Sequence, residues 1–198
     1  MRIFVAAIVG CSLFFGCAAR TRPSSDYQTL AKEPRRDAQL ARARNAEGKA
    51  LLEERKYAEA ERAFKEALRA DITYGPAHNN LGKAYYHQSK FYLAAWEFQY
   101  AIKLMPQQPE PRNNLGLVFE EVGKLDDAID HYGKAVALGP DNPNLLGNLV
   151  RARVRRGDSG DEIRDLLSKL IVTDSRAAWI QWAKEQLMWT SRGVPRER

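Results

Sequence analysis

Apolar residues along the middle of the chain follow a helical spacing. In residues 75–108, Leu81 and Tyr85 are positioned on one face of a first helix, and Phe98 and Ala101 on one face of a second. Short polar stretches separate the two predicted helices in successive segments of this kind. No stretch alternates apolar β-branched and polar residues between turn signals. The pattern therefore predicts an all-α chain built from helical hairpins.

The same positions recur every 34 residues, and small residues recur where two antiparallel helices must approach closely. They are Gly48, Gly82 and Gly116; Ala60, Ala94 and Ala128; Phe64, Phe98 and Tyr132; and Ala67, Ala101 and Ala135. Pro106 and Pro140 would end the second helices, because proline lacks an N–H and disfavours helix in the residue before it. A fixed period of this length indicates stacked hairpins, since one hairpin cannot bury its apolar face alone.

These residues resemble the tetratricopeptide repeat (TPR), which places Leu-Gly, Tyr, Ala, Phe, Ala and Pro at fixed offsets. The resemblance implies a helical-hairpin solenoid with units at residues 41–74, 75–108 and 109–142. The first unit departs from the pattern, with Leu51 at the tyrosine position and Ile72 at the proline position. The fold implies a binding scaffold and does not identify the partner.

A degenerate fourth unit is predicted over residues 143–172, which completes a TPR domain of residues 41–172. Ser159 and Glu162 have the spacing of a capping box at its second helix. A last helix within residues 173–190, capped by Asp174 or Ser175, carries three tryptophans. We expect this helix to cover the open end of the solenoid; the alternative is a helix that binds a partner or a membrane surface. Residues 191–198 are expected to be a tail.

The N-terminus has the pattern of an export signal. Residues 1–16 combine Arg2 with an uncharged apolar stretch that is shorter than the ~20 residues needed to span a bilayer, which predicts a signal peptide. Phe14-Phe15-Gly16-Cys17 resembles the lipobox of bacterial lipoproteins, which implies that Cys17 is acylated. Cys11, preceded by Ile8-Val9-Gly10, is the alternative, and a plain secretory signal is a third reading.

Residues 17–40 are then an acylated cysteine and a flexible linker that contains Pro23 and Pro34. Ala18, rather than aspartate, follows Cys17. In lipoproteins of many Gram-negative bacteria this favours the outer membrane. We therefore expect a chain that is exported and lipid-anchored to a bacterial membrane, on the periplasmic side of the outer membrane.

Charge and residue types argue against other classes. The formal net charge of +6 would suggest nucleic acid for a cytosolic protein, but no nucleic-acid-binding motif is present. The three histidines lack metal-ligand spacing, and both cysteines lie in the N-terminal segment. Phosphate-binding glycine loops and nucleophile elbows are absent, and Glu120-Glu121 is interpreted as surface charge. We expect no catalysis, metal, cofactor, nucleic acid or small-molecule substrate.

The resemblance also implies a concave groove lined by the first helix of each hairpin. Carried onto this chain, it gives one asparagine per repeat, at Asn80, Asn114 and Asn148. A carboxamide donates and accepts, so this column resembles the asparagine ladder that holds a peptide backbone in other TPR proteins. The alternative is that these asparagines are ordinary repeat structure.

Basic residues lie on or near the same predicted face. They are Lys49, Lys83, His87, Arg151 and Arg155. Leu117 and Glu121 occupy the third unit's groove, so the carboxylate-clamp pattern fails there. For the arginines, a solvated helix end near Asp158 and Asp161 is the alternative.

The sequence thus predicts a non-catalytic, membrane-anchored scaffold that binds a protein or extended peptide segment of another envelope protein and assists assembly or localisation of a complex. Two alternatives stay open. One is a structural protein that self-assembles through exposed repeat ends. The other is a protein that acts on a membrane surface through its basic linker and tryptophan-rich helix.

Overall fold

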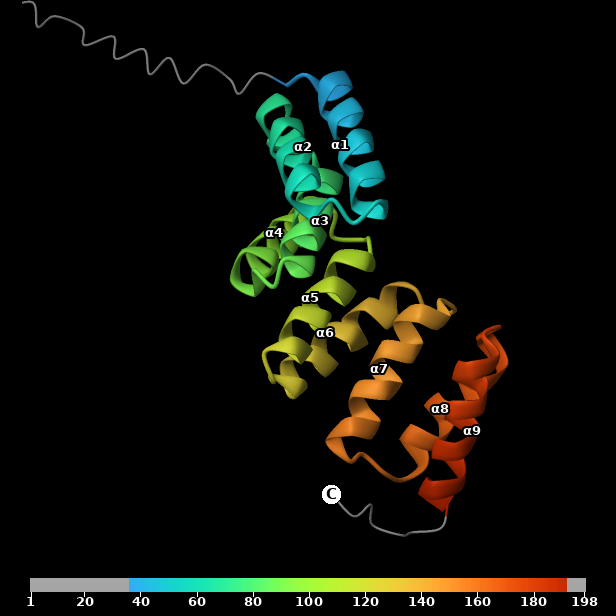
Figure 1. Cartoon of the computed structure of the whole chain (residues 1–198). Helices are drawn as coiled ribbons and strands as arrows, with labels where there is room; N and C mark the ends of the chain where they lie inside the picture. Colours follow the sequence, from blue (N-terminus) through green and yellow to red (C-terminus); the bar gives the residue numbers. More distant parts are fainter. Residues whose placement is uncertain (1–35, 192–198) are drawn as a thin grey trace, which may run out of the picture. The chain divides into compact units, whose positions relative to one another are not determined.

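A computed structural model describes residues 36–191, which form nine α-helices and no strand (Figure 1). The predicted signal peptide, Cys17 and the predicted linker up to residue 35 lie outside the described residues, as do residues 192–198 of the predicted tail. The helices are α1 (Ala38–Glu53), α2 (Tyr57–Ala70), α3 (Gly75–His87), α4 (Phe91–Leu104), α5 (Glu110–Glu121), α6 (Leu125–Leu138), α7 (Pro143–Arg156), α8 (Asp161–Thr173) and α9 (Ala177–Ser191). Among these helices, none combines the length and apolarity that crossing a membrane requires.

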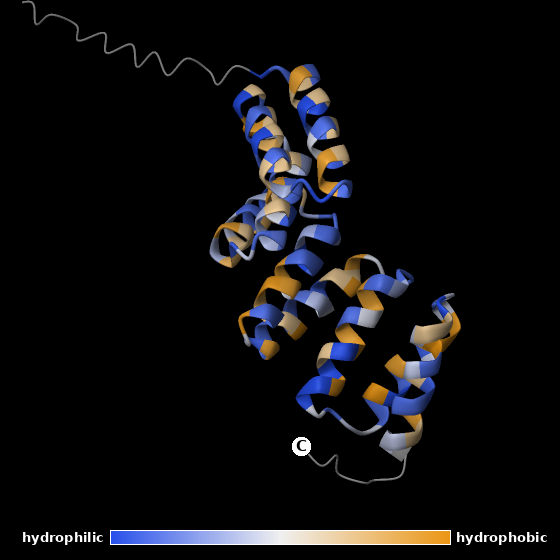
Figure 2. Cartoon of the chain, viewed as in Figure 1, coloured by the Kyte–Doolittle hydropathy of each residue, from blue (hydrophilic) through white to orange (hydrophobic). Residues whose placement is uncertain are grey.

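Consecutive helices pack as hairpins: α1 with α2, α3 with α4, and α5 with α6. Each hairpin also contacts the next, and the first helices of neighbouring hairpins touch, so α3 contacts both α1 and α5, and α5 contacts α7. Hydrophobic and hydrophilic residues alternate around the turns of the helices (Figure 2). One side of each helix can therefore be buried while the other meets solvent. The predicted all-α TPR-type fold is confirmed.

Glycine fixes how closely the two helices of a hairpin approach. A Cβ atom added to Gly82 would lie 2.6 Å from Cε1 of Phe98, and one added to Gly116 would lie 2.6 Å from Cε1 of Tyr132. The same contact recurs in the first hairpin between Gly48 and the ring of Phe64. These rings are fully buried, so each glycine accepts an aromatic ring against the bare backbone of the facing helix.

The fourth unit and α9 share a second core. This core contains the buried Ala183 of α9 together with buried residues of α7 and α8, which are Leu146, Val150, Ile163, Leu167 and Leu170. Trp179 and Trp182 pack against this cluster from α9. A Cβ atom on Gly147 of α7 would lie 3.0 Å from the Trp179 ring, so α9 also lies close to the first helix of the fourth unit. Two of the three tryptophans that follow residue 173 are thereby engaged in packing.

The two ends of α8 differ from the sequence expectation. Gly160, with a φ of 97°, is the N-cap, and no side chain caps the helix, so the predicted capping box of Ser159 and Glu162 is wrong. At the other end, Asp174 was expected to cap the last helix, but it is the C-cap of α8. Its carboxylate accepts a hydrogen bond from the backbone N–H of Arg176 at 2.9 Å. The last helix accordingly starts at Ala177.

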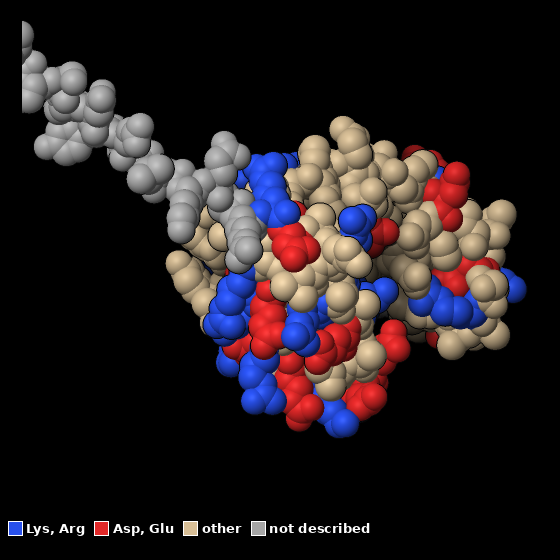
Figure 3. Space-filling model, turned by 90° about the horizontal axis from the view of Figure 1, so that it is seen from above, with Lys and Arg blue, Asp and Glu red and all other residues tan. Residues whose placement is uncertain are grey.

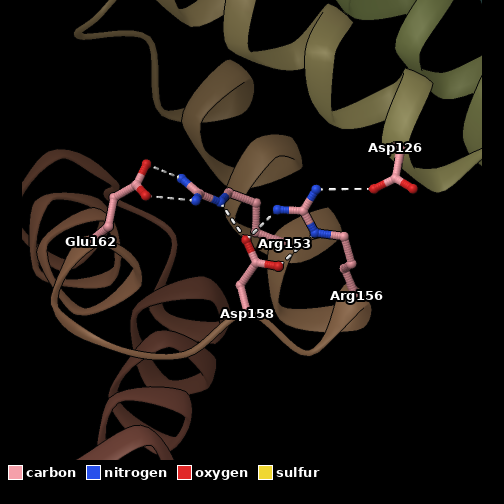
Figure 4. A network of polar contacts seen from close by, with 5 residues as sticks. All are labelled: Asp126, Arg153, Arg156, Asp158 and Glu162. Carbon is pink, nitrogen blue, oxygen red and sulfur yellow. Dashed lines mark hydrogen bonds and ion pairs between the residues drawn. The ribbon is translucent and has the colours of Figure 1, made fainter.

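Arginines of α7 hold the turn into α8 (Figure 4). The Arg153 guanidinium donates to Asp158 at 2.7 Å and forms two hydrogen bonds to Glu162. Arg156 donates to both carboxylate oxygens of Asp158, each at 2.6 Å, and to Asp126 of α6 at 3.0 Å. The carboxylate of Glu162 thus accepts hydrogen bonds from Arg153 and does not cap the helix, which explains why the capping box does not form.

Candidate functional site

The three predicted groove asparagines join neighbouring repeats. The side-chain nitrogen of Asn80 donates to Asn45 at 2.9 Å, and that of Asn114 donates to Asn79 at the same distance. Asn148 donates to Asn113, again at 2.9 Å. Each bond therefore runs from the first helix of one hairpin to the first helix of the preceding hairpin.

Sequence reasoning missed the accepting column of Asn45, Asn79 and Asn113, although its members also lie 34 residues apart. The signal was present, because two adjacent asparagines recur in the second and third units. The bond leaves the side-chain oxygen of each donor as its remaining polar atom. Asn80 is buried, whereas Asn114 and Asn148 are half-buried, so these last two are better placed to meet a ligand.

Basic side chains without ion-pair partners gather on α1 and α3. Lys83 is half-buried and forms no ion pair with any residue from 36 to 191. Burial lowers the pKa of its ammonium; the carboxylate of Glu110 opposes this effect and the nearby charge of Lys49 adds to it. Partial burial also lowers the pKa of His87, as do the charges of Lys83 and Arg55. Lys83 and His87 lie one turn apart on α3, and Lys49 of α1 is near enough to Lys83 to lower the pKa of its ammonium.

His87 is held in place by aromatic rings. It stacks on Tyr57 of α2 with ring centroids 4.8 Å apart, and Tyr86 contacts it edge-on at 5.6 Å. Three of the predicted groove residues, Lys49, Lys83 and His87, thus lie on the contacting helices α1 and α3, and none of them forms an ion pair with another residue from 36 to 191. We call this set the basic cluster.

Arg151 and Arg155 are paired with a carboxylate of a neighbouring helix instead. Both form ion pairs with Glu120 of α5, at 3.1 Å for Arg151. Burial raises the pKa of Glu120, but the Tyr132 hydroxyl at 2.8 Å and the two arginines outweigh burial and lower it. The interpretation of Glu120 as surface charge is wrong, because its side chain is only 9% exposed.

Arg151 also lines a small pocket beside α9. Ala178, Trp179 and Trp182 form the rest of this pocket, which has a volume of about 230 Å³. Arg151 follows Asn148 by one helical turn, so the two side chains share a face of α7. The pocket offers aromatic walls and one guanidinium, a combination that suits an apolar or aromatic side chain with a nearby acceptor.

Charge is mixed on one face of the molecule. On the face shown in Figure 3, lysine and arginine alternate with aspartate and glutamate and do not form one wide basic area. Within residues 36–191, no three His, Cys, Asp or Glu side chains are grouped as a metal site would require. The basic cluster lies on α1 and α3, within the first two hairpins.

The stacked hairpins, the recurring glycine–aromatic contacts and the asparagine bonds between first helices define a helical-hairpin repeat protein. A family model described as tetratricopeptide repeat matches residues 45–109 and 113–178. The chain belongs to the tetratricopeptide repeat family. No curated protein matches its sequence.

Solved structures show the same fold. The first TPR domain of Spaghetti (RPAP3), bound to the HSP90 peptide SRMEEVD, is 22% identical with a TM-score of 0.60, and the match covers 63% of this chain and 98% of that chain. YrrB, a TPR protein with an unusual peptide-binding site, is 23% identical with a TM-score of 0.61, over 75% of this chain and 76% of that one. MamA is 20% identical with a TM-score of 0.56, over 82% and 85%. At these identities the likeness shows the fold alone.

Proposed function

We propose that this chain is a non-catalytic scaffold that binds an extended, acidic segment of another protein along the first helices of its hairpins. The basic cluster carries the proposal. Lys49 and Lys83 lie one repeat apart, and the half-buried Lys83 ammonium has no carboxylate within ion-pair distance among the described residues. A partner carboxylate would supply the charge that this site lacks, and partial burial would strengthen the pairing.

Two further features support a peptide as the ligand. The side-chain oxygens of Asn114 and Asn148 remain to accept from the N–H groups of an extended backbone. The pocket beside Arg151 would take an apolar side chain of the same segment. Two solved neighbours are described as peptide-binding, and the HSP90 peptide bound by Spaghetti, SRMEEVD, is acidic.

The proposal extends to where the protein acts. The lipobox-like Phe14-Phe15-Gly16-Cys17 supports an acyl anchor on Cys17, on the periplasmic side of a bacterial outer membrane. The partner would then be an envelope protein, and binding would assist assembly or localisation of its complex. Labelling cells with palmitate tests the anchor. Cys17→Ser should abolish labelling and release the chain from membranes, whereas labelling lost only in Cys11→Ser would place the anchor there.

A peptide array tests the groove without knowledge of the partner. The whole chain is probed against arrayed peptides in which Asp and Glu are replaced stepwise by Asn and Gln. We expect the chain to retain acidic peptides preferentially and to lose them as salt is raised. Lys49→Ala with Lys83→Ala should lose the same peptides.

Lys134→Ala is the matched control, because Lys134 lies on a second helix and is paired with Asp130 at 2.5 Å. It removes the same chemical group outside the groove and should leave binding unchanged. If the array shows no preference for acidic peptides, or if the double variant binds them as well as the control does, the groove proposal is wrong.

A further inference from the structure

One helix exposes a row of aromatic side chains. Tyr92, Trp96 and Tyr100 of α4 lie one turn apart along a single face, and they are 79%, 51% and 41% exposed. Leu93, beside them, is 43% exposed. We call the three aromatic residues the α4 ridge. It lies on the second helix of its hairpin, whereas the basic cluster lies on the first helices, so the ridge does not belong to the proposed groove.

The repeat itself does not require this ridge. The equivalent positions of α2 are Ala58, Arg62 and Glu66, and those of α6 are Asp126, Asp130 and Lys134. All six are exposed, so this face of the second helix is solvent-facing in each hairpin. Only the second unit carries large aromatic residues there, and such residues are enriched at the centres of protein interfaces while Asp, Glu and Lys are depleted.

Two of the three rings are already held in position. Trp96 and Tyr100 contact each other with centroids 5.7 Å apart, and Tyr100 stacks on His78 at 5.3 Å. His78 is fixed in turn by Glu97 at 2.6 Å. Side chains that are ordered before binding lose less conformational freedom when a partner arrives.

The order of residues along the ridge is symmetric about Trp96. Tyrosines lie four residues before it and four residues after it. A two-fold axis through Trp96 would therefore place Trp96 against its own copy and Tyr92 against Tyr100 of the other copy, twice. A two-fold axis makes every contact occur in both directions, and here each of these contacts would join two aromatic side chains.

Charges agree with this arrangement. The ammonium of Lys103 lies 5.4 Å from the centre of the Tyr100 ring, and the axis would bring Lys103 near Ser89 and Lys90 of the other copy. Lys90 is paired with Glu61 of its own copy at 3.0 Å. Glu97 is occupied by His78. The ion pairs of Glu97 and Lys90 within each copy therefore reduce like-charge repulsion across the axis, and two antiparallel α4 helices can pack there.

We propose that the α4 ridge is a dimer interface that docks a second copy of this chain around a two-fold axis at Trp96. Its three aromatic side chains expose roughly 350 Å², taking about 200 Å² for each whole side chain. A standard interface buries about 800 Å² per partner, so the ridge would form the central anchor and the flanking residues the rim. The interface leaves the groove free in both copies.

Charge exchange at Trp96 tests the axis directly. The whole chain is compared by sedimentation velocity as wild type, as Trp96→Arg, as Trp96→Glu and as an equimolar mixture of the two variants. We expect the wild type to dimerise with rising concentration, and each variant alone to dimerise at least ~30-fold more weakly, because an interface anchor is lost and like charges meet. The mixture should recover dimers, since the guanidinium introduced in one copy would meet the carboxylate introduced in the other.

Trp189 provides the matched control, because it is 50% exposed on α9. Trp189→Arg and Trp189→Glu should dimerise like the wild type, and circular dichroism should show equal helix content in all variants. A wild type that stays monomeric, dimers that persist in both Trp96 variants, or a mixture that stays monomeric would each overturn the proposal. If the monomeric wild type instead floats with phosphatidylcholine vesicles and Trp96→Arg does not, the ridge faces lipid and the proposal is also overturned.

Discussion

The closest backbone approach in each hairpin can be tested by adding one methyl group. Gly82→Ala places a Cβ atom 2.6 Å from Cε1 and 2.8 Å from Cδ1 of Phe98, whose ring is 1% exposed. Gly133→Ala makes the same change inside α6, where a Cβ atom would meet nothing within 4 Å. The two variants therefore share their chemistry and differ in packing.

The magnitudes follow from this difference. Alanine stabilises a helix interior by about 1 kcal/mol relative to glycine, and this gain applies to both variants. Only Gly82→Ala must displace a buried ring, and overpacking of this kind costs roughly 1–3 kcal/mol. We expect Gly133→Ala to raise the free energy of unfolding, and Gly82→Ala to lie about 1–3 kcal/mol below it.

Urea titration followed by circular dichroism measures both variants against the wild type. Thermal melts should separate the two variants by about 2–4 °C for each kcal/mol. Gly82→Leu, which adds more atoms at the same place, should be less stable than Gly82→Ala. If Gly82→Ala is as stable as Gly133→Ala, the ring does not limit the approach of α3 and α4, and the packing argument fails.

Three further predictions concern polar groups. Burial alone would lower the pKa of His78, but hydrogen bonds to Glu97 and to a backbone carbonyl raise it above the unfolded value of about 6.5. The protonated His78 therefore stabilises the fold fully below about pH 6.5, and this stabilisation is lost as the pH rises through the raised pKa. Stability between about pH 6 and 8 should therefore fall with pH more steeply in the wild type than in Glu97→Gln, and equal slopes would contradict this. Asn45→Ala leaves the buried side-chain nitrogen of Asn80 without its acceptor and should lower the free energy of unfolding by roughly 1–3 kcal/mol in urea titrations. An unchanged free energy would show that the bond contributes nothing. Arg153→Ala removes bonds to two carboxylates and should cost roughly 1–2 kcal/mol, less at high salt. A loss of equal size at low and high salt would refute an ionic origin.

The fold could be predicted because it depends on spacing. A glycine and an aromatic residue recur together every 34 residues in the sequence. In the structure the two residues pack against each other, as Gly82 and Phe98 do. The capping box at Ser159 and Glu162 failed for the opposite reason. Its local pattern was correct, but Arg153, which lies outside that pattern on the preceding helix α7, binds the carboxylate of Glu162.

The candidate site was harder to predict, because periodicity shows which residues share a face and does not show what they bind. Lys83 and Arg151 were equivalent expectations from the sequence. The structure separates them, since Glu120 lies within ion-pair distance of Arg151 and no carboxylate does so for Lys83 among residues 36–191. The α4 ridge was likewise not found, because its aromatic residues fit a helical pattern and reveal their exposure only in three dimensions.

The asparagine bonds give the array a direction and a limit. Each repeat supplies an acceptor to the repeat that follows it, and the series stops at Gly147, which takes the place where a fourth acceptor would stand and receives the Trp179 ring instead. A duplicated unit inserted between residues 75 and 142 would find an acceptor in the unit before it and a donor in the unit after it. A unit added after the fourth would find no acceptor at Gly147, so its first helix would lack the hydrogen bond that joins the earlier units.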